Sequence, residues 1–120
     1  MTYINFKNYP IYCEIIDEVE MLNIYVFLFE YNKSQTLKRT ISRWLFSKPS
    51  YSVISEEERK QYYLDKDYHN SVRMNIPGNF VYESRNRIFV NYQVFLDILK
   101  WCDVKLSSDF SSFYEKKIKQ

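Results

Sequence analysis

The chain is poor in glycine, histidine and cysteine, and each shortage excludes a class of protein. Its 120 residues include one glycine, Gly78, whereas the Walker phosphate loop and the dinucleotide-binding fingerprint need several glycines where the backbone approaches phosphate. One histidine, His69, and two cysteines, Cys13 and Cys102, are too few for a four-ligand structural zinc site or a two-histidine metalloprotease helix. We therefore predict no metal site and no cofactor.

Long apolar runs are also absent. No stretch approaches the roughly 20 apolar residues that span a bilayer, and residues 1–10 are polar, unlike the apolar core of a secretory signal. Without such a signal, the two cysteines are expected to remain reduced thiols. The sequence thus predicts an intracellular protein with no membrane partner.

What the chain has in quantity is aromatic residues. The composition is 46% hydrophobic, 27% charged and 19% aromatic, which is typical of a compact globular chain with an aromatic core. No repeat, low-complexity tract or Pro/Gly/Ser-rich linker interrupts it, so we predict a single domain over residues 1–120.

The first half of the chain mixes strand and helix patterns. Alternation over residues 11–15 and a second extended piece near residues 21–22 predict strands, with the acidic residues 17–20 as the turn between them. The run IYVFLFEY at 24–31 is apolar on every side and fits either a buried strand or a short helix capped by Asn23. Residues 35–46 predict a helix, because Leu37, Ile41, Trp44 and Leu45 form one apolar stripe.

The second half carries clearer local patterns. Ser55 and Glu58 form a capping box that predicts a helix over 56–65, followed by a loop over 67–78. Residues 79–92 predict a β-hairpin with arms 80–82 and 88–90 and its tip at 84–86. Asn91 then caps a helix over 92–102, and a last helix begins after Ser107 or Ser108. Together these elements predict an α+β fold.

Charge is unevenly distributed along the chain. The net charge is only +2, yet residues 31–51 contain five lysines and arginines and no acidic residue. Such a segment is typical of a surface that binds a polyanion, although an ordinary solvated helix face has the same composition. The candidate nucleic-acid contacts in it are Lys33, Thr36, Lys38, Arg39, Thr40, Arg43 and Lys48, and Arg85, Asn86 and Arg87 at the predicted hairpin tip add a second set.

Two of these candidates have more specific expectations. Arg39 and Arg43 lie one turn apart, off the apolar stripe of the predicted helix. For Arg43, an ion pair with Glu30 or with an acid of residues 56–58 is an equal alternative to a nucleic-acid contact.

The order of these elements resembles the KilA-N family of large DNA viruses and phages. The shared features are two N-terminal strands, Asn23 at the start of the next element, a basic helix with Trp44, the hairpin from Gly78 to Val90, and the helix YQVFLDILKWC that ends near Trp101. The resemblance favours helix over strand for residues 24–31. It implies a small DNA-binding domain, similar to the APSES domain of fungi, with N-terminal strands, a helical core and a hairpin wing. It also implies a non-enzymatic viral protein that works in the cytoplasmic factories or the nucleus of a host cell, with DNA favoured over RNA.

Two other classes of function compete with nucleic-acid binding. Tyr51, Tyr62 and Tyr63 fall in polar surroundings, which suits a protein-interaction module, a homodimer or an antagonist of a host protein. An enzyme is disfavoured, because both cysteines fall in apolar contexts and no pair of carboxylates has an apolar surrounding to separate their pKa values. Trp44 and Trp101 are expected in the core rather than as stacking platforms for bases.

Overall fold

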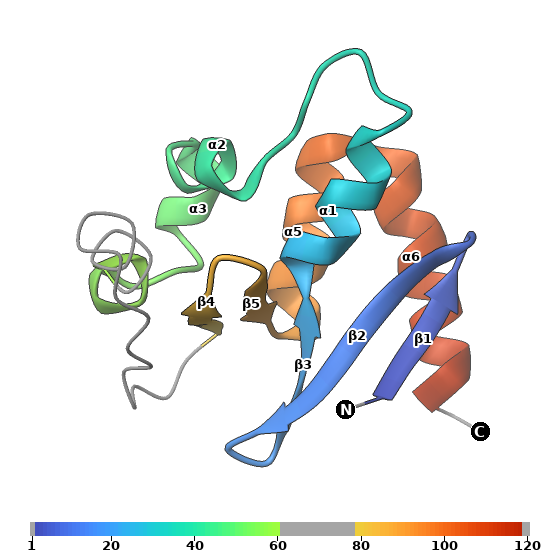
Figure 1. Ribbon diagram of the computed structural model, residues 1–120, viewed down its shortest axis with the longest axis horizontal. Coiled ribbons are helices and arrows are strands. Elements are labelled where there is room, and N and C mark those ends of the chain that lie inside the picture. The colour runs from blue at the N-terminus through green and yellow to red at the C-terminus, as the bar shows by residue number, and fades with distance from the viewer. Residues whose placement is uncertain (1, 61–78, 119–120) are drawn as a thin grey trace.

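An antiparallel sheet with helices packed on one face forms the described part of the protein (Figure 1). The computed structural model describes residues 2–60 and 79–118, and within them the sheet has five strands in the order β1-β2-β3-β5-β4. The elements are β1 (Thr2–Phe6), β2 (Tyr9–Ile16), β3 (Val19–Asn23), α1 (Ile24–Asn32), α2 (Ile41–Leu45), α3 (Lys48–Tyr51), β4 (Phe80–Ser84), β5 (Arg87–Val90), α5 (Tyr92–Cys102) and α6 (Val104–Ile118). The predicted α+β class is confirmed, and β1 is a strand that the sequence analysis did not place.

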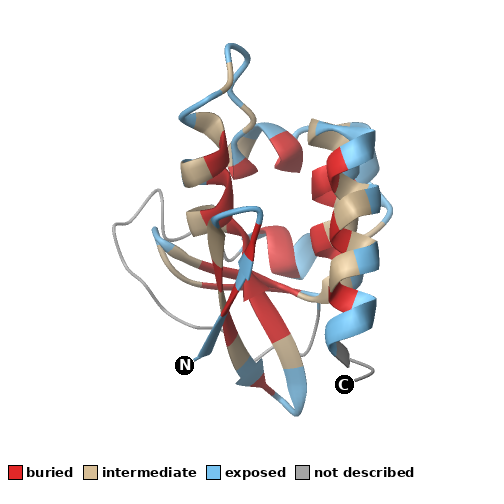
Figure 2. Ribbon diagram, turned by 90° about the vertical axis from the view of Figure 1, so that its right-hand side faces the viewer, coloured by how far each residue is buried: buried red, intermediate tan, exposed pale blue. Residues whose placement is uncertain are grey.

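The sheet and helices α1, α5 and α6 turn buried residues toward one another (Figure 2), and many of the buried side chains between them are aromatic. The rings of Phe27 and Phe95 lie 5.3 Å apart between their centroids, and Phe95 lies 4.8 Å from Phe110. Phe6 of β1 meets Phe110 edge-on at 5.1 Å. One connected set of rings therefore joins three helices to the sheet, as the aromatic composition predicts.

The first two hairpins show how a chain with one glycine makes tight turns. Lys7 and Asn8 connect β1 to β2, and Asp17 and Glu18 connect β2 to β3. All four have positive φ, between 50° and 69°, as both central residues of a type I′ turn require. The turn predicted within residues 17–20 is confirmed at its first two positions.

Residues 24–31 are helical, and one buried asparagine fixes where that helix begins. The side-chain oxygen of Asn23 accepts a hydrogen bond from the backbone N–H of Val26 at 3.1 Å, which is the ordinary N-cap geometry. Its side-chain nitrogen donates to the carbonyl of Asn86 at 3.1 Å. Asn23 therefore caps α1 and fastens the turn of the β4–β5 hairpin to it.

The predicted hairpin and the helix after it are both confirmed. The turn between β4 and β5 lies at Arg85 and Asn86, and the side-chain oxygen of Asn91 accepts from the N–H of Val94 at 2.9 Å to cap α5. The start of α6 is a correction, because the helix begins at Val104 rather than after Ser107 or Ser108. Asp103 supplies the cap, since its carboxylate accepts from the N–H of Lys105 at 2.9 Å.

The helix predicted over 35–46 is wrong over its first half. Residues 33–40 are not helical, and α2 covers only residues 41–45. Leu37 is 56% exposed, whereas Ile41, Trp44 and Leu45 are buried as the stripe predicts. The helix starts late because Thr40 is its N-cap and the residues before it are held in a loop by contacts to α1, described below.

The capping box of Ser55 and Glu58 is confirmed and does more than start a helix. The Glu58 carboxylate accepts from the backbone N–H of Ser55 at 2.9 Å and from that of Phe80 at 2.7 Å, so it ties the helical turn 56–60 to the start of β4. Arg59, also buried, donates to the carbonyl of Leu45 and lies over the ring of Tyr51. The rest of the predicted helix 56–65, the loop 67–78, Tyr62, Tyr63 and His69 lie outside the described residues.

The two thiols are not bonded to each other. Burial raises the pKa of Cys13 to about 11 and that of Cys102 to about 12, so both remain neutral near pH 7. In the ranges 2–60 and 79–118, no helix is long and apolar enough to cross a bilayer.

Candidate nucleic-acid interface

The cationic segment, residues 33–48, is fastened to the end of α1 by one side chain. Asn32 donates from its side-chain nitrogen to the carbonyl of Arg39 at 2.6 Å, and its side-chain oxygen accepts from the N–H of Arg39 at 2.9 Å. Lys38 donates from its ammonium to the carbonyls of Asn32 and Gln35, where a cation complements the negative end of the α1 dipole. These contacts close residues 33–39 into a loop, which is the physical reason why no helix begins at residue 35.

Arg39 lies between this loop and α5. Its guanidinium carbon is 4.7 Å from the centroid of the Trp101 ring, and both side chains are half-buried. Such a cation–π contact contributes about 0.5–1 kcal/mol where it is partly exposed. Trp101 therefore covers the core and also supports an arginine, whereas Trp44 is fully buried as predicted.

The remaining candidates of the segment project from α2, α3 and the loop. Thr40 accepts the cap hydrogen bond from the N–H of Arg43 at 3.2 Å, and the guanidinium of Arg43 donates to the carbonyl of Lys38 at 3.1 Å. Lys48, in the first turn of α3, and Thr36 are both exposed.

Four of these cations keep an uncompensated charge. Lys38, Arg39, Arg43 and Lys48 form no ion pair with a carboxylate in the described part of the chain. The two ion pairs considered for Arg43 are thus not formed with the described acids. Lys33 differs, because its ammonium lies 3.1 Å from the Glu30 carboxylate.

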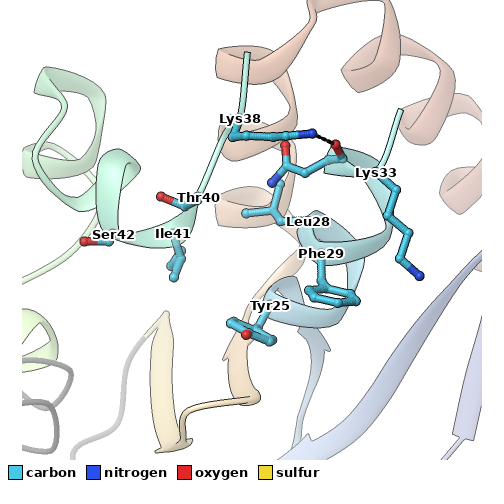
Figure 3. A pocket seen from close by; sticks show the side chains of 9 residues that line it. Tyr25, Leu28, Phe29, Lys33, Lys38, Thr40, Ile41 and Ser42 are labelled. Atoms are coloured by element: carbon cyan, nitrogen blue, oxygen red, sulfur yellow. Dashed lines mark hydrogen bonds between the residues drawn. The ribbon is translucent and has the colours of Figure 1, made fainter. Parts of the chain in front are cut away.

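A groove separates α1 from the start of α2 (Figure 3). Its volume is about 390 Å³. The lining residues are Tyr25, Leu28, Phe29, Asn32 and Lys33 on one side and Lys38, Thr40, Ile41 and Ser42 on the other. The structure therefore brings the predicted contacts Lys33, Lys38 and Thr40 to the edge of one apolar depression.

The hairpin candidates have different surroundings. Arg85 is exposed at the turn, and Asn86 uses its carbonyl to accept from the Asn23 side chain. Arg87 is engaged on the sheet, 2.9 Å from the Glu83 carboxylate and 2.5 Å from that of Glu14. These hydrogen bonds, that of Glu83 foremost, raise the pKa of Arg87. Two carboxylates neutralise its charge, so among the described residues Arg85 is the one cation of this turn with no carboxylate partner.

Sequence reasoning did not identify the aromatic wall of the groove. Tyr25 and Phe29 lie one turn apart on α1, and Phe29 is 56% exposed. The pattern that indicates them is the run IYVFLFEY, which is apolar on every side. A helix with one buried face cannot cover all of these residues, so some of its aromatics must lie outside the core.

The chain matches no protein-family model, no curated protein sequence and no solved structure.

Proposed function

We propose that this protein binds nucleic acid through the cationic segment, residues 33–48. One observation carries the proposal: Lys38, Arg39, Arg43 and Lys48 lie within eleven residues of sequence and have no carboxylate partner among the described residues. Lysine and arginine side chains of this kind neutralise phosphates and release the counterions condensed on the strand. Arg87 differs from these four cations, because it forms ion pairs with the carboxylates of Glu14 and Glu83.

Preorganisation strengthens this proposal. Lys38 is already held by the carbonyls of Asn32, at the end of α1, and of Gln35, in the loop, and Arg39 is held by the Trp101 ring. Less side-chain entropy is then lost when a phosphate binds than for a freely rotating lysine. The exposed Arg85, on a turn that Asn23 ties to the start of α1, is the candidate for a further contact outside the segment.

The resemblance to the KilA-N family supports DNA as the nucleic acid and duplex DNA as the expected form. The contacts proposed here are to phosphates, which fix position but carry no sequence information. We therefore expect binding that depends strongly on salt and weakly on sequence.

The test is a salt titration of binding to fluorescent DNA, followed by anisotropy from about 50 to 200 mM salt. Four phosphate contacts on a duplex predict a slope of log K against log salt of about −3 to −4. The variant Arg43→Glu with Lys48→Glu removes two exposed cations that support no core contact, and it should bind at least tenfold more weakly with a slope smaller by about 2.

The matched control reverses two charges elsewhere. Lys116→Glu with Lys117→Glu makes the same change of net charge on exposed positions of α6. This control should retain most of the affinity if the segment is the binding surface. Equal loss in both variants would show that only net charge matters, and no binding at the lowest salt would overturn the proposal.

A second candidate function is self-association through β1. This strand is at one edge of the sheet, its five residues are uncharged, and Tyr3 is 64% exposed. An uncharged edge strand can pair with another copy of the same strand. Light scattering coupled to size exclusion, on the natural chain and on Tyr3→Lys, measures whether a dimer forms and whether a charge on β1 dissociates it.

A further inference from the structure

The wall of the groove formed by α1 is a pair of aligned rings. The Tyr25 and Phe29 ring planes differ by 18°, with their centroids 6.5 Å apart. Phe29 is one of the most exposed large apolar side chains of the described chain, at 56%. An exposed phenylalanine that contributes little to the core is costly in water, which makes this ring a candidate contact surface for a ligand.

The rest of the groove combines an apolar floor with polar edges (Figure 3). Leu28 and Ile41 are buried and form the floor, while Thr40 and Ser42 bring hydroxyl groups to the α2 side. The only acid bound to a groove-lining cation among the described residues is Glu30, which pairs with Lys33. The depression therefore suits a flat apolar group that carries polar edges and is attached to negative charge.

Two lysines at the edge of the groove are positioned to bind the negative charge of such a ligand. The Lys33 ammonium lies 5.1 Å from the centroid of the Phe29 ring, so an anion bound by Lys33 is adjacent to a group stacked on Phe29. The Lys38 ammonium donates to the carbonyls of Asn32 and Gln35 and retains one N–H for a ligand. An aromatic surface between two cations is the arrangement by which proteins hold single-stranded nucleic acid.

The size of the groove separates the possible occupants. A volume of about 390 Å³ falls in the range of sites for small ligands and suits a single nucleotide. A peptide helix needs anchor pockets along two or more turns, which this depression between α1 and α2 does not provide. Bases stacked within a duplex expose only their edges, so they cannot lie on the Phe29 ring.

We propose that the groove receives one unpaired nucleobase of a nucleic-acid strand, stacked on Phe29 and Tyr25, with the flanking phosphates on Lys38 and on Lys33, where the phosphate replaces the Glu30 carboxylate. This inference rests on the proposed nucleic-acid binding and names its substrate class: a strand with at least one unpaired base. The family resemblance implies a duplex instead. The cationic segment contacts phosphates, which both forms carry, so the segment alone does not distinguish a single strand from a duplex.

The test compares three oligonucleotides of about 12 nucleotides by fluorescence anisotropy at one low salt concentration. They are a single-stranded oligothymidine, the same backbone with abasic residues throughout, and the thymidine strand paired with oligoadenosine. Stacking of one base is worth about 5- to 100-fold in affinity. We expect the single strand to bind tighter than the abasic strand by a factor in this range, and also tighter than the duplex.

Variants locate the base. Phe29→Ala should lower the affinity for oligothymidine to that for the abasic strand and leave the abasic strand unchanged, whereas Phe29→Tyr, which keeps the ring, should retain the affinity. Ile15→Ala is the matched control, because Ile15 is a large exposed apolar side chain on β2 that lies outside the groove. Circular dichroism of each variant verifies that the fold is retained.

The outcomes of this test distinguish a failure of the base site from a failure of nucleic-acid binding by the cationic segment. If thymidine and abasic strands bind equally with a steep salt dependence, the base site is overturned while nucleic-acid binding stands. Equal weakening by Phe29→Ala and Ile15→Ala also overturns the base site. If none of the three oligonucleotides binds at low salt, both proposals fail, and an acidic peptide becomes the ligand to test in the same groove.

Discussion

Two regions of this protein are held in place by different kinds of contact. The sheet–helix core, made of the five strands with α1, α5 and α6, is joined by interlocking aromatic rings such as Phe27, Phe95 and Phe110. Segment 33–60, which carries the loop, α2, α3 and the helical turn 56–60, inserts a few apolar side chains and depends otherwise on hydrogen bonds from polar ones. Asn32 fixes its beginning and Glu58 its end.

This difference explains why the candidate interface lies on segment 33–60. A region anchored at two ends by hydrogen bonds leaves its remaining polar side chains free to face solvent. The cations Lys38, Arg43 and Lys48 are all exposed there, while the core buries its helices on their apolar faces. Substitutions of buried side chains should therefore affect stability, and substitutions of the exposed cations of segment 33–60 should affect binding.

The largest effect is expected in the core. Phe95 is fully buried and contacts both Phe27 and Phe110. Phe95→Ala should lower the free energy of unfolding by about 3–5 kcal/mol, the usual cost of emptying a large aromatic site. Urea unfolding followed by circular dichroism measures it. Phe29→Ala serves as control and should cost less than about 1 kcal/mol, and a similar loss in both variants would contradict the burial of Phe95 as described.

The next largest loss of stability is expected at Asn23, where the start of α1 meets the turn of the β4–β5 hairpin. Asn23→Ala removes the cap of α1 and the donor to the Asn86 carbonyl, and we expect a loss of about 2 kcal/mol. Asn91→Ala removes the cap of α5 and a donor to the Asn79 side chain, but at a half-exposed position, and should cost about 1 kcal/mol. Asn23→Ser keeps a cap acceptor and should recover part of the loss. Equal costs at the two asparagines would show that the burial of Asn23 adds nothing to the worth of its hydrogen bonds.

Most of the core could be predicted from local sequence patterns. Asn91 with the apolar face after it and the turn at Arg85 and Asn86 both depend on residues a few positions apart. Their geometry is set by caps and periodicity, which act before any tertiary contact forms.

Segment 33–60 could be predicted only in part, because long-range contacts override its periodicity. The spacing of Leu37 and Ile41 favours a helix, but Asn32 binds the backbone of Arg39 in an extended loop and Thr40 starts the helix later. Whether a candidate cation pairs with a carboxylate likewise depends on residues far away in sequence. Arg87 is neutralised by Glu14, which is 73 residues away in sequence, and no local pattern contains that information.

A smaller loss of stability is expected when the hydrogen bonds that hold the start of segment 33–60 to α1 are removed. Asn32→Ala removes both hydrogen bonds to the Arg39 backbone and should cost about 1–2 kcal/mol. The sharper readout is amide hydrogen exchange at Arg39, which should accelerate more than exchange in α5. Asn32→Asp keeps the acceptor for the Arg39 N–H but loses the donor to its carbonyl, so it should protect that amide more than Asn32→Ala does. Unchanged exchange at Arg39 in Asn32→Ala would contradict the described anchor.

The smallest loss of stability is expected at Leu37. Its size distinguishes the observed loop from the helix that the apolar periodicity predicts. In a continuous helix over 35–46, Leu37 and Ile41 share one buried face, and removing either side chain should cost about 2 kcal/mol or more. The structure instead exposes Leu37 and buries Ile41. Leu37→Ala should therefore change the free energy of unfolding by less than about 0.5 kcal/mol, while Ile41→Ala costs about 2–4 kcal/mol. Urea titrations of the two variants side by side measure the difference, and comparable losses would place Leu37 against the core and make residues 33–40 helical after all.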